Sequence, residues 1–249
     1  MEYCFKNLNK IEFVVTDSCT GKCRHCSQGD HSMKGSSIDG RTAAAFVTDV
    51  CREFDINTVM TFGGEPLLFP ESVFLIHSAA TRAGVLHRQL ITNGYFSKRY
   101  DYICKIAYGI RRCGINDVLL SADAFHQEYI PIDYPLFLSK CLLDLDVSVK
   151  CQPAWLVGSD ADNSYNRTTR EILCEFEKIG VMQNSGNIIF RSGNAAKYLS
   201  EYFDDDSPDD PYAESSDDIR TLSVDSYGNV LGGNIYNDSV LNITNGRRL

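Results

Sequence analysis

The sequence lacks any long hydrophobic run. No apolar stretch in its 249 residues approaches the ~18 residues that cross a membrane. The first residues also lack the hydrophobic segment of a signal peptide. We therefore expect no membrane partner and a cytoplasmic protein.

Positive charge is scarce. There are 24 lysines and arginines against 33 aspartates and glutamates, which gives a formal net charge of −9. A nucleic-acid backbone requires a basic surface, so this balance argues against nucleic acid as a partner. The hydrophobic fraction of 43% and the length fit one sizeable globular domain, with room for a small appendage.

Cysteine is absent after Cys174, although the chain has ten cysteines. A cytoplasmic chain of this size does not need disulfides, so we expect free thiols and metal ligands. Seven cysteines are scattered without ligand spacing and are expected to act mainly as small buried hydrophobic residues: Cys4, Cys51, Cys104, Cys113, Cys141, Cys151 and Cys174.

The other three cysteines form a C-x3-C-x2-C pattern directly behind the apolar run 11–16: Cys19, Cys23 and Cys26. Thiolates are the usual ligands of iron–sulfur clusters, and three of them can hold three irons of a cubane. The fourth iron would stay open to bind a small molecule. A zinc site made of these cysteines and His31 is the alternative, but the second half of a paired zinc motif is missing.

Short apolar runs alternate with helical patterns from residue 11 to about residue 190, which is typical of βα units around a parallel sheet. The predicted strands are 11–16, 58–62, 88–92, 117–123, 147–152 and 187–190. The predicted helices start near Asp39, at Pro70, near 97, near 135, and at a capping box formed by Thr168 and Glu171. Six units predict a partial (β/α)6 barrel of the TIM type, with the site at the carboxyl ends of the strands.

The cysteine spacing resembles that of the radical S-adenosylmethionine (radical SAM) superfamily. The resemblance implies that Cys19, Cys23 and Cys26 hold a [4Fe-4S] cluster whose open iron chelates S-adenosylmethionine. His25 stands where the family usually has an aromatic residue, and its backbone would face the adenine. This resemblance covers roughly residues 8–195.

Three further strand ends carry motifs similar to those of the family. Gly63, Gly64, Glu65 and Pro66 resemble the GGE motif, where glycines allow close backbone approach and a carboxylate favours the methionine ammonium. Thr92-Asn93-Gly94 resembles the family's TNG motif.

Ser121 and Asp123 resemble the S-x-D motif, where polar side chains meet the ribose and methionyl ends of the cofactor, and Gln152 ends the next strand. His126 follows Asp123. It is either a general acid or base or a packed loop residue, and Asp123 and His126 are the candidate catalytic side chains.

The tail resembles a degenerate C-terminal extension of the SPASM or twitch type, found in peptide-modifying radical SAM enzymes. We place the barrel domain at 8–195 and this extension at 196–249, with a hairpin and a helix. Without cysteines it would hold no second cluster, and it would cap the barrel mouth or extend the sheet. An acidic, proline-broken loop at 203–218 is either solvated or attracts a basic substrate.

The resemblance implies an enzyme that reductively cleaves S-adenosylmethionine to a 5′-deoxyadenosyl radical, which abstracts hydrogen from a substrate. Its electron donor would be a flavodoxin or ferredoxin. The tail favours a peptide or protein side chain as substrate, although the chain has no room for a separate leader-binding domain of ~80 residues. The alternatives are a small metabolite such as a sugar or nucleotide, a glycyl-radical-enzyme activating enzyme, and a non-catalytic metal-binding module.

Overall fold

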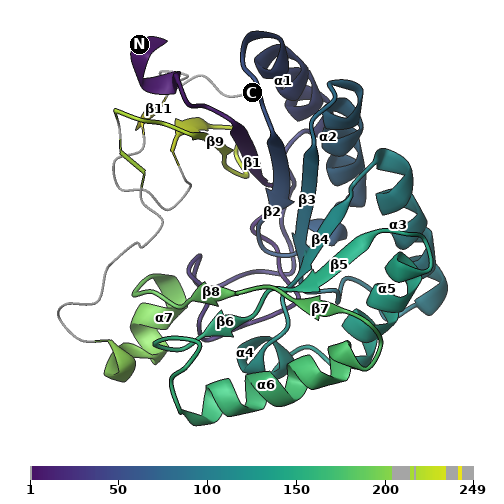
Figure 1. Cartoon of the computed structure of the whole chain (residues 1–249), viewed down its shortest axis with the longest axis vertical. Helices are drawn as coiled ribbons and strands as arrows, with labels where there is room; N and C mark the ends of the chain where they lie inside the picture. The colour runs from purple at the N-terminus through teal and green to yellow at the C-terminus, as the bar shows by residue number, and fades with distance from the viewer. Residues whose placement is uncertain (1, 204–213, 216, 234–240, 243–249) are drawn as a thin grey trace.

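The computed structural model describes residues 2–203, 214–215, 217–233 and 241–242. Its strands form an open, curved sheet with the long helices on the convex side (Figure 1). The strand order is β11-β10-β9-β1-β2-β3-β4-β5-β7. The parallel barrel strands are β1 (Lys10–Val14), β2 (Thr58–Phe62), β3 (His87–Thr92), β4 (Asp117–Leu120), β5 (Ser148–Cys151) and β7 (Met182–Gln183). The predicted partial barrel of six βα strands is confirmed.

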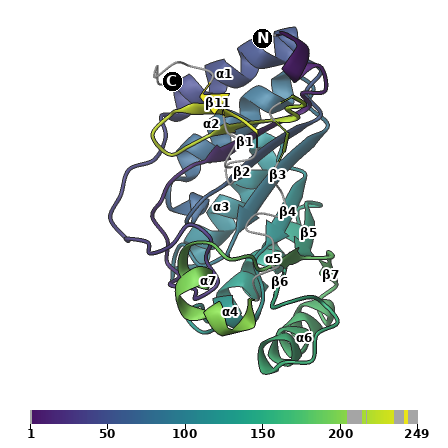
Figure 2. The same ribbon diagram turned by 90° about the vertical axis from the view of Figure 1, so that its left-hand side faces the viewer.

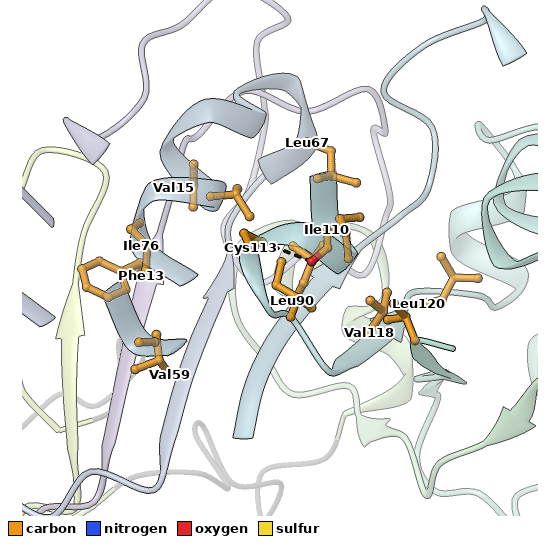
Figure 3. Close-up of a cluster of buried hydrophobic side chains, with 14 of the residues drawn as sticks. Phe13, Val15, Val59, Leu67, Ile76, Leu90, Ile110, Cys113, Val118 and Leu120 are labelled. Atoms are coloured by element: carbon orange, nitrogen blue, oxygen red, sulfur yellow. Dashed lines mark hydrogen bonds between the residues drawn. The ribbon is translucent and has the colours of Figure 1, made fainter. Parts of the chain in front are cut away.

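Side chains alternate between the two faces of each strand, as the period of two requires. In β1, Ile11 and Phe13 are fully buried in the main hydrophobic core. Figure 3 shows Phe13 among the other side chains of this core. Glu12 lies between them in sequence and lines the cavity inside the barrel. The outward faces of the strands therefore build the core, and the inward faces are free to form a site.

Five helices cover the outer face of the sheet (Figures 1 and 2). They are α1 (Gly40–Glu53), α2 (Pro70–Arg82), α3 (Tyr100–Cys113), α5 (Asp133–Leu143) and α6 (Ser164–Glu177). The predicted N-cap of α1 is confirmed, because the Asp39 carboxylate accepts a hydrogen bond from the Thr42 amide at 2.7 Å. Pro70 occupies the first turn of α2 as predicted. Within the described residues, no helix combines the length and apolar character of a membrane span.

The predictions for the sixth barrel strand and for the start of the last barrel helix were wrong. The sixth barrel strand is β7, and residues 187–190 instead contribute β8 (Asn187–Ile188), which pairs with β6 (Ala154–Trp155) in a separate two-stranded sheet. Ile188 is 50% exposed and Ile189 packs in a smaller buried cluster, so this apolar run is not a strand of the main core. The two residues of β7 are too few to show a periodic pattern.

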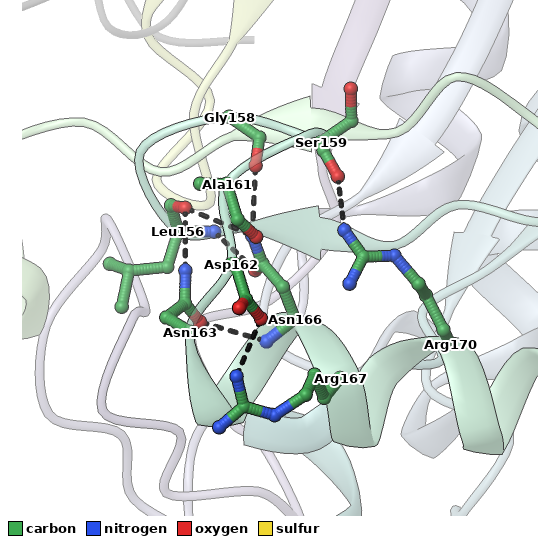
Figure 4. Close-up of polar contacts among 9 residues, drawn as sticks. All are labelled: Leu156, Gly158, Ser159, Ala161, Asp162, Asn163, Asn166, Arg167 and Arg170. Carbon is green, nitrogen blue, oxygen red and sulfur yellow. Dashed lines mark hydrogen bonds and ion pairs between the residues drawn. The ribbon is translucent and has the colours of Figure 1, made fainter.

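The start of α6 was also misplaced, because Thr168 lies inside the helix. The N-cap is Asn163, whose side chain accepts a hydrogen bond from the Asn166 amide. Fully buried Asn166 then bonds the Leu156 amide and the carbonyl oxygens of Leu156, Gly158 and Ala161, which fixes the preceding loop (Figure 4). The loop therefore dictates where the helix begins.

The C-terminal hairpin extends the main sheet. Its first strand, β9 (Thr221–Val224), pairs in parallel with β1, and β10 (Val230–Gly232) pairs antiparallel with β9. Strand β11 (Leu241–Asn242) follows at the edge. Helix α7 (Gly193–Tyr198) spans the predicted domain boundary, which stays a prediction. Most of the predicted acidic loop, at 204–213 and 216, lies outside the described residues.

Candidate active site

A cavity of about 400 Å³ opens at the carboxyl ends of the barrel strands and continues down the barrel interior. Most of the side chains predicted for the site line it together: Cys19, Cys23, His25, Cys26, Gly63, Gly64, Asn93, Ser121, His126 and Gln152. Three others, Glu65, Pro66 and Asp123, are buried behind its wall. The strand-end motifs thus meet at one mouth.

The three thiols of the cysteine loop share this cavity and lie in partly apolar surroundings. Burial raises the pKa of Cys19 to about 12 and raises that of Cys23 well above its ordinary value. Such thiols are poor nucleophiles on their own, but binding to iron removes the proton. A chain that gathers three thiols around one cavity supplies the donor set of an iron–sulfur cluster.

The geometry argues against a single zinc ion held by these cysteines and His31. Tetrahedral zinc, with bonds of about 2.0–2.3 Å, requires its ligand atoms to lie within about 4 Å of one another. Across the part of the chain that the structure describes, the one group of three ligand atoms within 4.8 Å is Cys23, His25 and His126. The three cysteines are therefore spread more widely than zinc requires, as suits a larger group.

The surroundings of His25 test whether the cavity is built to hold a bound group. Its ring lies against Phe125, with the ring centres 5.0 Å apart, and against His126 at 4.7 Å. Its Nδ1 is buried without a protein partner. Burial lowers the pKa of His25 to about 4, so the ring is neutral. An orphaned polar atom beside the thiols is consistent with a bound group that completes the site.

The glycines of the GGE segment bring two loops into close contact. The Gly64 amide donates to the Thr16 carbonyl at 2.8 Å, and the Glu65 amide donates to the Ser18 carbonyl at 2.7 Å. A Cβ on Gly64 would lie 2.2 Å from the Ser18 oxygen, and Gly63 has φ +134°. The glycines thus hold the start of the cysteine loop against strand β2 as well as lining the cavity.

The Glu65 carboxylate joins the second and third strand ends. It accepts hydrogen bonds from the Leu67 amide at 3.0 Å, the Thr92 hydroxyl at 2.8 Å and the Asn93 amide at 2.8 Å. Burial raises its pKa to about 7, although these donors act in the opposite direction. The ammonium contact predicted for Glu65 stays a prediction, and the carboxylate also links the loops that follow β2 and β3.

Asn93 connects the third strand end to the cysteine loop. Its side-chain amide donates to the Thr20 hydroxyl at 3.1 Å and contacts Cys19 Sγ at 3.6 Å. On the opposite wall, Gln152 donates to Asn187 at 3.1 Å and accepts from Asn184 at 2.8 Å. These amides offer hydrogen bonds to a ligand without adding charge.

Asp123 is fully buried, and its carboxylate is occupied by the chain itself. It caps α4 (Ala124–Gln127) by accepting from the amides of Phe125 and His126. It also accepts from the Ala154 amide at 3.0 Å and from His126 Nδ1 at 2.8 Å. Burial acts to raise the pKa of Asp123, but the interactions with His126 outweigh it and hold that pKa well below its usual range. Asp123 therefore orients His126 at the cavity wall.

Helix α7 holds the cysteine loop from the other side, which the sequence patterns did not predict. The Asn194 amide donates to the Cys26 carbonyl at 2.8 Å, and its side chain donates to the Cys23 carbonyl at 3.3 Å. The Ser192 hydroxyl donates to the Ser27 carbonyl at 3.1 Å. No sequence pattern around Ser192 and Asn194 indicated a contact with the cysteine loop.

Comparison with known proteins agrees with this arrangement. The family model described as "Radical SAM superfamily" matches residues 13–136, which include the cysteine loop and the second to fourth strand ends. The chain belongs to the radical SAM superfamily. Members of this superfamily bind a [4Fe-4S] cluster and S-adenosylmethionine, and the predicted family resemblance is confirmed.

Curated relatives carry the name GTP 3′,8-cyclase. The protein from Desulforamulus reducens is 26% identical over 125 residues, which are 49% of this chain and 37% of the relative. The protein from Vibrio parahaemolyticus is 30% identical over 125 residues, 47% of this chain and 36% of the relative. The radical SAM chain described here thus spans little more than a third of the length of these relatives.

Two solved structures share the fold over nearly the whole chain. Streptococcus suis SuiB bound to S-adenosylmethionine has a TM-score of 0.60 at 12% identity, covering 95% of this chain and 63% of SuiB. SuiB bound to its precursor peptide SuiA has a TM-score of 0.62 at 11% identity, covering 98% and 64%. At this identity the likeness shows the fold alone.

Proposed function

We propose that this radical SAM chain reductively cleaves S-adenosylmethionine and uses the resulting radical to abstract hydrogen from a substrate. The observation that carries the proposal is the gathering of Cys19, Cys23 and Cys26 with the GGE and TNG loops around one cavity. When bound, the cluster supplies the electron that cleaves S-adenosylmethionine to methionine and a 5′-deoxyadenosyl radical.

The residues of the chain position the reactants and exclude water. The cysteine loop holds the three thiols, and Glu65, Asn93 and Asn194 fix the loops around it through hydrogen bonds to the backbone or side chains. Below the mouth, an apolar belt lines the cavity: Met60, Phe62, Ile91 and Leu119. Such a belt limits water near a reactive radical, which would otherwise be consumed in side reactions. Ser121 and Gln152 provide polar contacts at the rim.

For the substrate, we propose a small polar metabolite. The floor of the cavity is charged, because Lys10 Nζ pairs with the Glu12 carboxylate at 2.7 Å and Ser223 donates to that carboxylate at 2.7 Å. A charged floor within a narrow barrel suits a compact molecule with polar groups at the end remote from the thiols. The names of the curated relatives, which refer to a nucleotide, support the same class.

A peptide, which the sequence analysis favoured, is the second candidate. Strand β8 forms part of the cavity wall, and Ile188 on this strand is 50% exposed. Among the described residues β8 pairs with β6 alone, so its other edge could add an extended peptide as a further strand. A peptide would then present one side chain to the cavity.

The proposed reaction needs an external one-electron donor, and we propose a flavodoxin or ferredoxin for this role. The first test uses anaerobically reconstituted protein with dithionite in place of that donor. Addition of S-adenosylmethionine should give 5′-deoxyadenosine. Cys23→Ala should abolish the product, whereas Cys174→Ala, which removes an exposed cysteine remote in sequence from the loop, should not. Protein that binds zinc without acid-labile sulfide would contradict the proposal.

The two substrate classes can be separated with the same preparation. Release of 5′-deoxyadenosine above the basal rate should follow addition of nucleotides or phosphorylated sugars if the substrate is a small metabolite. Lys10→Gln should then lower this stimulation while leaving the basal cleavage unchanged. Stimulation by peptides alone, unaffected by Lys10→Gln, would favour the second candidate.

A further inference from the structure

His31 lies beside the cluster ligands but belongs to none of the motifs that define the site. Its ring lines the cavity, and its Nε2 is 3.0 Å from Cys26 Sγ. Its Nδ1 is 2.7 Å from the carbonyl oxygen of Asp17. One ring thus connects the backbone before the cysteine loop to the sulfur at its end.

The direction of the two hydrogen bonds follows once Cys26 is bound to iron. A carbonyl oxygen only accepts, so Nδ1 of His31 donates to Asp17. An iron-bound Cys26 sulfur has no proton and also accepts only. In that cluster-bound state the 3.0 Å contact requires Nε2 to donate to the sulfur, so both ring nitrogens of His31 would carry a proton. A neutral ring with a bare Nε2 would place two acceptors in contact.

We propose that His31 is a positioning residue that donates a hydrogen bond to the Cys26 sulfur and raises the reduction potential of the cluster. Hydrogen bonds to cluster sulfurs are among the features by which a protein sets that potential. A reduced cluster carries one more negative charge, so a donor at the sulfur stabilises the reduced state more than the oxidised state. This inference rests on the cluster-binding part of the proposed function.

The hydrogen bond to Asp17 fixes the orientation of the His31 ring in the folded loop. The Asp17 carbonyl holds the ring so that Nε2 points at Cys26, in the way that second partners orient histidines at metal sites. The backbone of Asp17 also lies beside the GGE loop, since a Cβ on Gly64 would be 3.1 Å from its carbonyl carbon. The donor is therefore positioned by the same contacts that position the thiols.

The test is a redox titration of the reconstituted cluster, followed by EPR, in wild type and in His31→Phe and His31→Gln. Removing a hydrogen bond donor from a charged sulfur should destabilise the reduced cluster more than the oxidised one. At a fixed potential, we expect the ratio of reduced to oxidised cluster to be about tenfold lower in His31→Phe than in wild type. This corresponds to a reduction potential that is lower by about 59 mV for one electron. His31→Gln retains a donor and should lie between the two.

The control is Met33→Ala, which alters a 64% exposed side chain of the same loop and should leave the potential unchanged. Iron and sulfide are measured in every sample. Equal potentials in wild type and both His31 variants, each with a full cluster, would overturn the inference. Loss of the cluster from both variants would also overturn it, because His31 would then be holding the metal. If wild type binds the cluster but makes no 5′-deoxyadenosine, the proposed reaction fails while this test still stands.

Discussion

Replacing Asp123 by alanine should weaken the fold as well as the site. The change removes an acceptor that serves four donors: the amides of Phe125, His126 and Ala154, and the His126 ring. All four groups surround a carboxylate with no exposed surface. A buried donor left without a partner costs about 1–3 kcal/mol, and breaking a buried charged contact costs about 3–5 kcal/mol in total.

We expect Asp123→Ala to lower the free energy of unfolding by about 3–5 kcal/mol at pH 7. For a chain of this size that corresponds to about 6–20 °C in Tm. The assay is thermal and urea unfolding of the cluster-free protein, so that metal loss does not contribute. Asp39→Ala is the matched control, because Asp39 also caps a helix but is exposed, and its effect should be clearly smaller.

The effect should depend on pH with a defined sign. The pKa of Asp123 is held below its usual range, so the folded protein keeps this carboxylate ionised where the unfolded chain takes up a proton. Its contribution is complete at neutral pH and is lost as the pH falls below about 4. The stabilities of wild type and Asp123→Ala should therefore converge in acid. A difference below about 0.5 kcal/mol at pH 7, the range of ordinary surface changes, would refute the role assigned to Asp123.

Three other predictions concern the contacts around the site and the core. Asn194→Ala should speed iron release to a chelator several-fold, because the cysteine loop loses the hydrogen bond from the Asn194 side chain to the Cys23 carbonyl, whereas Asn184→Ala should not; equal rates would contradict this role of Asn194. Gly64→Ala should prevent full cluster assembly, because its Cβ would meet backbone at 2.2 Å, while Gly158→Ala, with no atom within 4 Å, should assemble normally. Burial lowers the pKa of His77 to about 3, so between pH 6.5 and 3 the His77 ring takes up a proton in the unfolded chain but not in the folded protein. The free energy of unfolding should therefore fall by several kcal/mol as the pH is lowered from 6.5 to 3. His77→Phe should reduce that slope in urea titrations, and an unchanged slope would disprove the assignment.

The part of the site that lies in continuous motifs could be predicted from the sequence. The spacing of Cys19, Cys23 and Cys26, and the glycines that follow β2, mark positions at strand ends, and parallel strands bring their ends to one edge. What the motifs did not reveal is where a side chain points. That Glu65 and Asp123 contact the cofactor stays a prediction, and the motifs did not reveal that their carboxylates accept hydrogen bonds from backbone amides.

Contacts between distant segments could not be predicted. Asn194 reaches the Cys23 carbonyl across 171 residues, and no local pattern specifies that pairing. The same holds for Ser223, which bonds Glu12 across 211 residues and brings β9 beside β1. Strand β7 was missed because its two residues show no alternation.

The central claim is that three cysteines hold a cluster with one iron open to S-adenosylmethionine. The most direct test is the EPR spectrum of the dithionite-reduced, reconstituted protein before and after S-adenosylmethionine is added. We predict the signal of a reduced [4Fe-4S] cluster, with about four irons and four sulfides per chain, and a clear change of its g-values on addition. A cluster signal that S-adenosylmethionine leaves unchanged, or no cluster signal at all, would contradict the account.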